Sequence, residues 1–325
     1  MSQRFSFFVA GGCFLGLSLA IACGSDGEDS KFGDGSSGGA SSGATSSGGS
    51  LLGSSGAGGE GGAFGEGGIP GNCNAPVDMF IMLDRSGSMA PDDNDDGNIG
   101  DTSTKWERSI TALSGYFNSA GSKDQGAALQ FFPLDSQNNS LCSTGDGYHV
   151  AAAPTAAPNF LTLPSNGFDK LLNDERPADD GAGLGTPTEA AIRGMIRFTN
   201  ANRRPGRVTI GILITDGNPN NCNEDRDELA DMLKAHYDQT QLRTYVIGME
   251  GASFDNVERI AQGGGTPEHP DTVGALNNAC GGDTAPCRHW NVGDGNPAAF
   301  EAALKAIQES ADGCKPGGGV INPVK

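Results

Sequence analysis

The sequence predicts an α/β fold in which helices flank a doubly wound, mostly parallel central sheet. Apolar, strand-like runs alternate with amphipathic, helix-like segments between residues 77 and 311, as in chains built from βαβ units. The first run, residues 77–83, is apolar on both faces, as expected of a central strand covered by helices on each side. It ends in Asp84 and a later apolar run ends in Asp216, and strand ends are where open α/β sheets carry ligand groups.

The predicted elements follow one another regularly along the chain. We expect strands at residues 77–83, 127–132, 148–152, 208–215, 242–248 and around 289–292. Four helices are predicted from apolar residues at helical spacing. Their apolar positions are Trp106, Ile110, Leu113 and Phe117 in residues 105–119; Ala191, Met195 and Phe198 after Pro187; Leu229, Met232, Leu233 and Tyr237; and Phe300, Leu304, Ile307 and Ala311 after an Asn296-Pro297 cap.

Composition and charge restrict the classes of function. The chain has 325 residues, 52 of them Gly, with a formal net charge of −19. Nucleic acids require a basic surface, so this charge argues against nucleic-acid binding. The simplest interpretation of the acidity is that it keeps an exported protein soluble.

The N-terminal region predicts an export signal. Residues 1–22 carry one charged side chain, Arg4, ahead of an apolar run, which is the order found in secretory signal peptides. The run is too short and too interrupted by Gly for a membrane span. We therefore expect residues 1–22 to be a signal peptide.

The end of this signal resembles a bacterial lipoprotein cleavage box. The chain reads Ala20-Ile21-Ala22-Cys23, although the usual Leu stands one place early, at Leu19. The resemblance implies that Cys23 is lipidated and that a lipid anchor holds the protein at a membrane, with the outer membrane or cell surface as the expected location. The alternative is an ordinary secretory signal cut near Ala22, which would leave Cys23 as a free thiol.

The rest of the chain divides into a tether, a folded domain and a tail. Residues 24–72 are dominated by Gly and Ser and cannot bury enough apolar surface to fold, so we expect residues 23–72 to be the lipidated Cys and a disordered tether. The folded domain is expected at 73–314, and residues 315–325 are expected to be a flexible tail.

Five oxygen-bearing side chains are the candidate metal ligands. Asp84, Ser86 and Ser88 form a D-x-S-x-S motif at the end of the first strand, Thr186 stands at a helix start, and Asp216 ends the strand at 208–215. Two carboxylates and three hydroxyls form an all-oxygen set that suits Mg²⁺ or Mn²⁺. Thr186 and Asp216 can each also be explained by a purely structural role, without a metal. Thr186 with Glu189 matches a helix capping box, and Asp216-Gly217 matches a turn.

In residue type and chain order, this set resembles the metal-ion-dependent adhesion site of von Willebrand factor type A domains. The resemblance implies that Ser86 and Ser88 coordinate the cation directly and that Thr186 joins them in the ligand-bound state. It also implies that Asp84 and Asp216 act mainly through bound water. The cation would then bridge to a carboxylate of a protein or cell-surface ligand.

A second, calcium-binding interpretation applies to the segment that follows the motif. Asp92, Asn94 and Asp96 stand at places 1, 3 and 5 of a calcium-loop pattern, with Gly97 at place 6. The closing Glu is missing, because Ser103 stands at place 12. The alternative is a solvated acidic insertion.

The cysteines beyond Cys23 predict three disulfides, for which 15 connectivities exist. Type A domains hold their termini close together, so the resemblance implies a bond between Cys73 and Cys314. Cys280 and Cys287 are close in sequence and are expected to pair locally, which leaves Cys142 with Cys222. A zinc site from Cys280, Cys287 and His289 is the competing interpretation, but it lacks a fourth ligand.

The sequence favours binding over catalysis. None of the four histidines stands in a nucleophile or zinc motif, and neither G-x-S-x-G nor H-E-x-x-H occurs. The first hypothesis is a surface-anchored, metal-dependent adhesion or ligand-capture protein. The alternatives are an assembly component of an envelope complex and an extracellular metal-dependent hydrolase.

Overall fold

The protein is described by a computed structural model over residues 75–90, 104–134, 142, 147–152, 159–175, 177, 185–311, 314–315 and 319–320, the last two pairs for their backbone only. All of these residues belong to one compact unit, Gly62–Lys325. The elements, in chain order, are β1 (Val77–Asp84), η1 (Gly87–Met89), α1 (Lys105–Asn118), η2 (Ala120–Ser122), β2 (Gly126–Phe132), β3 (Leu161–Thr162), η3 (Asn166–Phe168), α2 (Asp169–Asp174), α3 (Thr188–Ala201), β4 (Val208–Thr215), α4 (Arg226–Thr240), β5 (Thr244–Gly248), α5 (Phe254–Gly263), β6 (Trp290–Asn291), α6 (Pro297–Ala311), β7 (Cys314–Lys315) and β8 (Gly319–Val320).

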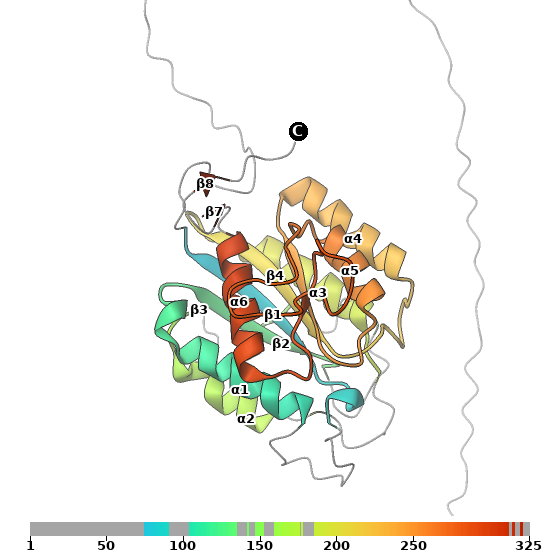
Figure 1. Ribbon diagram of the computed structural model, residues 1–325. Helices are drawn as coiled ribbons and strands as arrows, with labels where there is room; N and C mark the ends of the chain where they lie inside the picture. The colour runs from blue at the N-terminus through green and yellow to red at the C-terminus, as the bar shows by residue number, and fades with distance from the viewer. Residues whose placement is uncertain are drawn as a thin grey trace, which may run out of the picture. The chain divides into compact units, whose positions relative to one another are not determined.

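A six-stranded sheet organises the unit, with strand order β3-β2-β1-β4-β5-β6 (Figure 1). All neighbouring strands are parallel except β3, which is antiparallel to β2 at one edge. The chain builds outward from β1 to β2 and then returns to the other side of β1 with β4. The predicted doubly wound α/β fold is therefore confirmed, and its topological switch point lies between β1 and β4.

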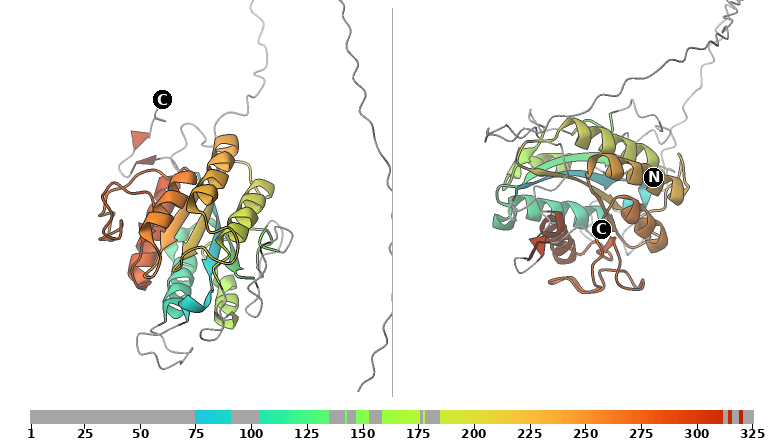
Figure 2. Two further views of the ribbon diagram at one scale, coloured as in Figure 1. Left: turned by 90° about the vertical axis from the view of Figure 1, so that its right-hand side faces the viewer. Right: turned by 90° about the horizontal axis from the view of Figure 1, so that it is seen from above.

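Helices cover both faces of the sheet (Figure 2), and the two cores divide the side chains of β1 between them. Met79, Ile81 and Leu83 pack with α1, α2 and α6, whereas Phe80 and Met82 pack with α3, α4 and α5. Every residue of β1 is buried, as the apolar run predicts for a strand enclosed on both faces.

The strands agree with the prediction except at one edge. Residues 148–152 were expected to form a strand, and that prediction is wrong. This segment reaches β2 through one main-chain bond, from Ala152 N to Leu129 O (2.7 Å), and the Gln130 side chain donates to Val150 O (2.6 Å). No ladder forms there, and β3 makes the antiparallel ladder with β2.

The four predicted helices are present as α1, α3, α4 and α6, and two short helices were not predicted. The predicted apolar positions of α1, α3 and α6 are buried. On α4 the pattern holds only in part, since Met232 and Tyr237 are half-buried and His236 is buried instead. Helices α2 and α5 escaped prediction because each is short and offers few apolar repeats.

Two of the predicted disulfides are formed, Cys142–Cys222 and Cys280–Cys287. Cys73 lies outside the described residues and the side chain of Cys314 is not described, so their bond stays a prediction. The signal peptide, Cys23, the tether and the loop with Asp92, Asn94 and Asp96 also lie outside the described residues. No helix in the described part of the chain is both long and apolar enough to cross a membrane.

Candidate metal centre

The ends of the two central strands bring Asp84 and Asp216 together. β1 and β4 are parallel neighbours with Leu83 opposite Ile214, so the residues that follow them leave the sheet at the same edge. Both carboxylates are buried, with exposures of 0% and 1%. Two buried acidic side chains therefore lie at the switch point of the sheet, at the ends of apolar strands.

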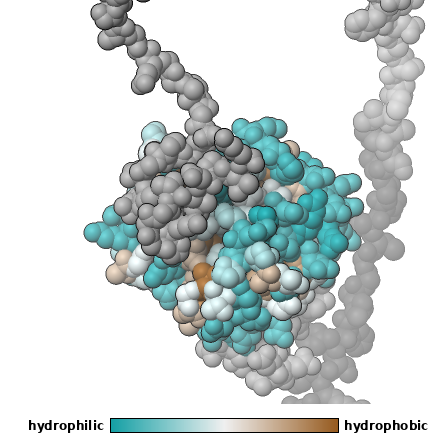
Figure 3. All heavy atoms as spheres, turned by 45° about the horizontal axis from the view of Figure 1, so that its top comes forward, coloured by the Kyte–Doolittle hydropathy of each residue, from teal (hydrophilic) through white to brown (hydrophobic). Residues whose placement is uncertain are grey.

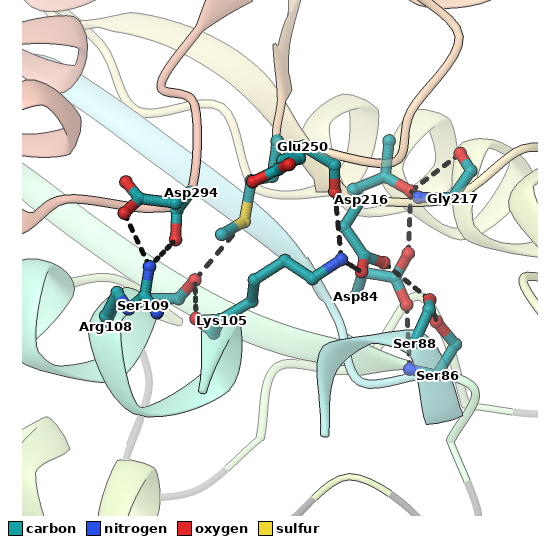
Figure 4. A network of polar contacts seen from close by, with 12 residues as sticks. Asp84, Ser86, Ser88, Lys105, Arg108, Ser109, Asp216, Gly217, Glu250 and Asp294 are labelled. Carbon is teal, nitrogen blue, oxygen red and sulfur yellow. Dashed lines mark hydrogen bonds and ion pairs between the residues drawn. The ribbon is translucent and has the colours of Figure 1, made fainter. Parts of the chain in front are cut away.

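Serine hydroxyls connect the two carboxylates (Figure 4). Ser86 N donates to Asp84 Oδ1 (2.8 Å), the Ser86 and Ser88 hydroxyls lie 3.0 Å apart, and Ser88 Oγ donates to Asp216 Oδ1 (2.7 Å). Ser86 is buried and Ser88 is exposed, so the chain of hydroxyls runs from the interior to the surface. The cluster can therefore be reached from solvent on the Ser88 side.

Thr186 reaches the same cluster from a separate loop. A Cβ atom on Gly217 would lie only 2.9 Å from Thr186 Oγ1 and 3.7 Å from Ser88 Oγ, which puts the threonine hydroxyl against the turn after Asp216. The lack of a side chain at Gly217 makes this approach possible. The structure thus brings together all five residues that the sequence singled out.

The capping interpretation of Thr186 is wrong. The N-cap of α3 is Pro187, and no side chain caps this helix. Glu189, which a capping box would turn back toward the cap, instead pairs with Arg193 and accepts a bond from Asn223 N (3.0 Å). The Thr186 hydroxyl is therefore not committed to the helix N-terminus.

Asn220 fixes the backbone of Thr186 in two directions. Thr186 N donates to Asn220 Oδ1 (2.6 Å), and Asn220 N donates to Thr186 O (3.0 Å). Cys222, two residues farther on, is bonded to Cys142. The loop after β4 therefore supplies both Asp216 and the support for Thr186.

Burial, and after it the neighbouring Asp216 carboxylate, raise the pKa of Asp84 to about 7. Hydrogen bonds from Thr215 and Ser86 act in the opposite direction, because they favour the charged form. Thr215 Oγ1 donates to Asp84 Oδ2 (2.6 Å). In the part of the chain that the structure describes, no Lys, Arg or His forms an ion pair with Asp84.

The donor set fits a hard divalent cation. Two buried carboxylates in close proximity repel each other, and a doubly charged ion between oxygen donors relieves that repulsion. The hydroxyls of Ser86, Ser88 and Thr186 add neutral oxygens of the kind that Mg²⁺ and Mn²⁺ accept. A cysteine and histidine cluster of the kind that binds softer metals lies elsewhere, at His269, Cys280 and Cys287, and its two cysteines are joined in a disulfide.

Three contributors to the site were missed at the sequence level. Thr215 precedes Asp216 directly and could have been noticed as a second polar residue at the strand end. Asn220 and Lys105 could not be predicted from the sequence. Asn220 lies in a loop and Lys105 at the start of a helix, and the sequence does not show that either side chain points toward the site. Lys105 Nζ, at the first residue of α1, donates to Asp216 Oδ2.

Comparison with known proteins gives structural similarity alone. No family model matches the chain, and no curated protein matches it either. Proximal thread matrix protein 1 from the mussel byssus, one of whose structures has a zinc-occupied MIDAS motif, is 12–13% identical with a TM-score of 0.38, over 74% of this chain and 49% of that chain. The pilus adhesin SpaC from Lactobacillus rhamnosus GG is 14% identical with a TM-score of 0.42, over 74% and 31%. The PilB minor pilin from Streptococcus sanguinis is 13% identical with a TM-score of 0.41, over 73% and 62%.

This chain therefore spans less than two thirds of the length of each of these proteins. None of the similarities assigns a ligand to it.

Proposed function

We propose that the domain binds one divalent cation, Mg²⁺ or Mn²⁺, through Asp84, Ser86, Ser88, Thr186 and Asp216, and uses it to capture a ligand. One observation carries this proposal: Asp84 is fully buried beside a second carboxylate, and no basic side chain among the described residues pairs with it. A buried, uncompensated carboxylate is costly unless a cation arrives from outside. The cation would supply a positively charged centre that an acidic group can bind.

The residues of the site have separate roles in this proposal. Ser86 and Ser88 offer neutral hydroxyl oxygens, so they leave the positive charge of the cation largely uncancelled. Asp216 orients the Ser88 hydroxyl by a hydrogen bond, Asp84 accepts from the main-chain N of Ser86, and the Thr186 hydroxyl lies against the turn at Gly217. A side chain that presents one carboxylate could approach from the exposed Ser88 side.

Polar rather than apolar recognition agrees with the surface. Among the described residues, Val150 is the one large hydrophobic side chain with substantial exposure. The face shown in Figure 3 is coloured mostly as hydrophilic where it is not grey. Since the chain carries a net charge of −19, an acidic ligand would be repelled at long range, and the cation would supply the local attraction. A ligand with one Glu or Asp among basic residues would suit this field.

We further propose that the protein is exported and held at the cell envelope by a lipid on Cys23, so that the ligand is a protein or a cell-surface polymer. Labelling with a radioactive fatty acid should mark the protein, and Cys23→Ala should release it into the soluble fraction. Labelling that persists in the variant would contradict the lipid anchor. A pull-down from the producing cell's envelope would separate adhesion from assembly, because one abundant partner favours an assembly role.

The hydrolase alternative finds no support in the histidines. His149 contacts Arg197, and His289 contacts Glu258. His269 contacts main-chain carbonyls and the sulfur of Cys287. In the described part of the chain, no histidine ring forms a hydrogen bond with a Ser or Thr hydroxyl. A binding role therefore remains our proposal.

Calorimetry of the folded domain tests the metal site. Asp84→Ala combined with Ser86→Ala should abolish Mg²⁺ binding while the circular dichroism spectrum is retained. The matched control is Ser114→Ala with Asp169→Ala, which removes the same residue types and one Ser–Asp hydrogen bond (2.7 Å) between α1 and α2. Undiminished affinity in the first variant, or equal loss in the control, would contradict the assignment.

Ligand capture is tested by comparing partner binding with and without EDTA. The partner recovered from the envelope should dissociate when the divalent cation is chelated and should bind again when Mg²⁺ is restored. Equal binding in EDTA would show that the domain works through another surface.

A further inference from the structure

Lys105 brings a positive charge of the protein's own to the candidate metal centre. It is the first residue of α1, and its ammonium group donates to Asp216 Oδ2 and to the main-chain oxygen of Glu250 (2.9 Å), as Figure 4 shows. The Lys105 side chain is 21% exposed, and the Asp216 side chain is fully buried. The ion pair is therefore shielded from solvent on the carboxylate side.

Asp216 is shared between this ammonium and the serine hydroxyls. Its Oδ2 accepts from Lys105, whereas its Oδ1 accepts from Ser88 Oγ (2.7 Å). The Asp216 carboxylate thus links Lys105 to the hydroxyls that would hold the cation. Among the described residues, it is the one basic side chain that pairs with either acidic residue of the centre.

We propose that Lys105 is a tethered cation that stabilises the metal-free centre and competes electrostatically with the divalent ion. This inference rests on the proposed function, since it concerns the same site. Without metal, the ammonium offsets one of the two buried carboxylates and keeps Asp216 oriented toward Ser88. With metal bound, the +1 charge of Lys105 and the +2 charge of the cation would share the Asp216 carboxylate, and their repulsion would weaken metal binding.

The site should therefore be ordered without metal, and it should need a higher concentration of the cation for binding than it would without Lys105. Replacing Lys105 by an uncharged residue should therefore have two opposite effects. The metal-free protein should lose stability, because Asp216 is left buried without its partner. The affinity for Mg²⁺ should rise, because the competing charge is gone.

The experiment compares Lys105→Met with two controls in calorimetry and thermal unfolding. Lys105→Met should lower the unfolding temperature in EDTA and should tighten Mg²⁺ binding by about tenfold or more. Lys105→Arg keeps the charge and should bind Mg²⁺ about as the unchanged chain does. Arg108→Met also removes one positive charge from α1, but Arg108 pairs with Asp294 rather than with Asp216, so it should change the affinity much less.

If Lys105→Met does not fold, Lys105→Gln keeps a hydrogen-bond donor without the charge and takes its place. Unchanged or weaker Mg²⁺ binding in the neutral variant would overturn the inference, and so would equal tightening in Arg108→Met. If the unchanged chain binds no divalent cation at all, the proposed function itself fails, which is a different result from a failure of the Lys105 comparison.

Discussion

Strand β1 has a buried aspartate near each end, and the two aspartates have opposite kinds of hydrogen-bond partner. Asp78 near the amino end and Asp84 at the carboxyl end are both 0% exposed. Asp78 is enclosed by two guanidinium groups, with Arg204 Nε at 2.6 Å and Arg207 Nε at 2.7 Å from its oxygens. Among the described residues, the donors to Asp84 are neutral groups of Ser86 and Thr215.

This difference separates a carboxylate with a structural role from one that, in our proposal, takes part in binding a cation. The hydrogen bond from Arg204 to Asp78 raises the pKa of Arg204, so that guanidinium stays charged and paired. At the other end, burial and then Asp216 raise the pKa of Asp84 to about 7. The protein thus compensates the negative charge of one aspartate with its own arginines, whereas we propose that an ion from solution compensates the charge of the other.

The largest expected effect is at the amino end. Asp78→Ala should destabilise the domain by about 3 kcal/mol, because it leaves Arg204 and Arg207 partly buried without their shared carboxylate. Added Mg²⁺ should not restore this loss. Urea unfolding with and without Mg²⁺ measures both, and recovery of stability by the metal would break the proposed division between the two ends.

The second prediction concerns how the stability of the domain depends on pH through Asp84, at the carboxyl end of β1. In EDTA, the folded state holds a proton on Asp84 up to a pKa of about 7, whereas the unfolded chain releases it near the ordinary aspartate pKa of 3.8. The folded state therefore binds more protons in this window, and stability should fall as the pH rises through it, by roughly 2 kcal/mol or more.

Asp84→Asn is the matched variant for that prediction, because it keeps the shape of the side chain without its charge. It should remove most of the fall in stability between pH 4 and 7 and should also abolish stabilisation by Mg²⁺. Thermal unfolding in EDTA across this range gives the measurement. A pH dependence identical to that of the unchanged chain would mean that Asp84 is not the group that titrates.

The third prediction sharpens the role of Thr186. Thr186→Ala should weaken partner binding by about tenfold, and Mg²⁺ binding by less, because the proposal gives its hydroxyl to the cation mainly in the ligand-bound state. The unfolding temperature should change little, since the hydroxyl does not cap α3. Thr199→Ala, on the helix α3 that follows Thr186, removes a hydroxyl that donates to main-chain oxygens of α3 and should leave binding intact.

The smallest expected effect is at Asn220, which holds the backbone of Thr186. Asn220→Ala should cost about 1 kcal/mol of stability for the lost hydrogen bond and should weaken partner binding slightly. Asn218→Ala in the same loop is the control, because Asn218 bonds to Ser253 and Asn256 instead. Equal effects of both variants on partner binding would show that the loop as a whole, not the support of Thr186, matters.

Local sequence patterns were enough to predict the strands and helices with strong repeats. The apolar run 79–83 within β1 and the helical spacing in α1, α3 and α6 are local patterns that each fit one kind of element, so these elements could be predicted. The five candidate ligands could also be singled out, because residue type and chain order are written in the sequence. Short elements such as α5 and β3 were missed because they form through contacts with the rest of the fold.

Which partners balance the charge of each buried aspartate became visible in the folded protein and could not be predicted from the sequence. Asp78 and Asp84 stand on the same strand, and nothing local tells that Arg204 and Arg207 reach the first while Thr215 reaches the second. The ion pair between Lys105 and Asp216 likewise joins residues that are distant in sequence. The energy of a buried charge depends on which partners the folded chain brings within a few ångströms, and that distance exists only after the sheet and helices have packed.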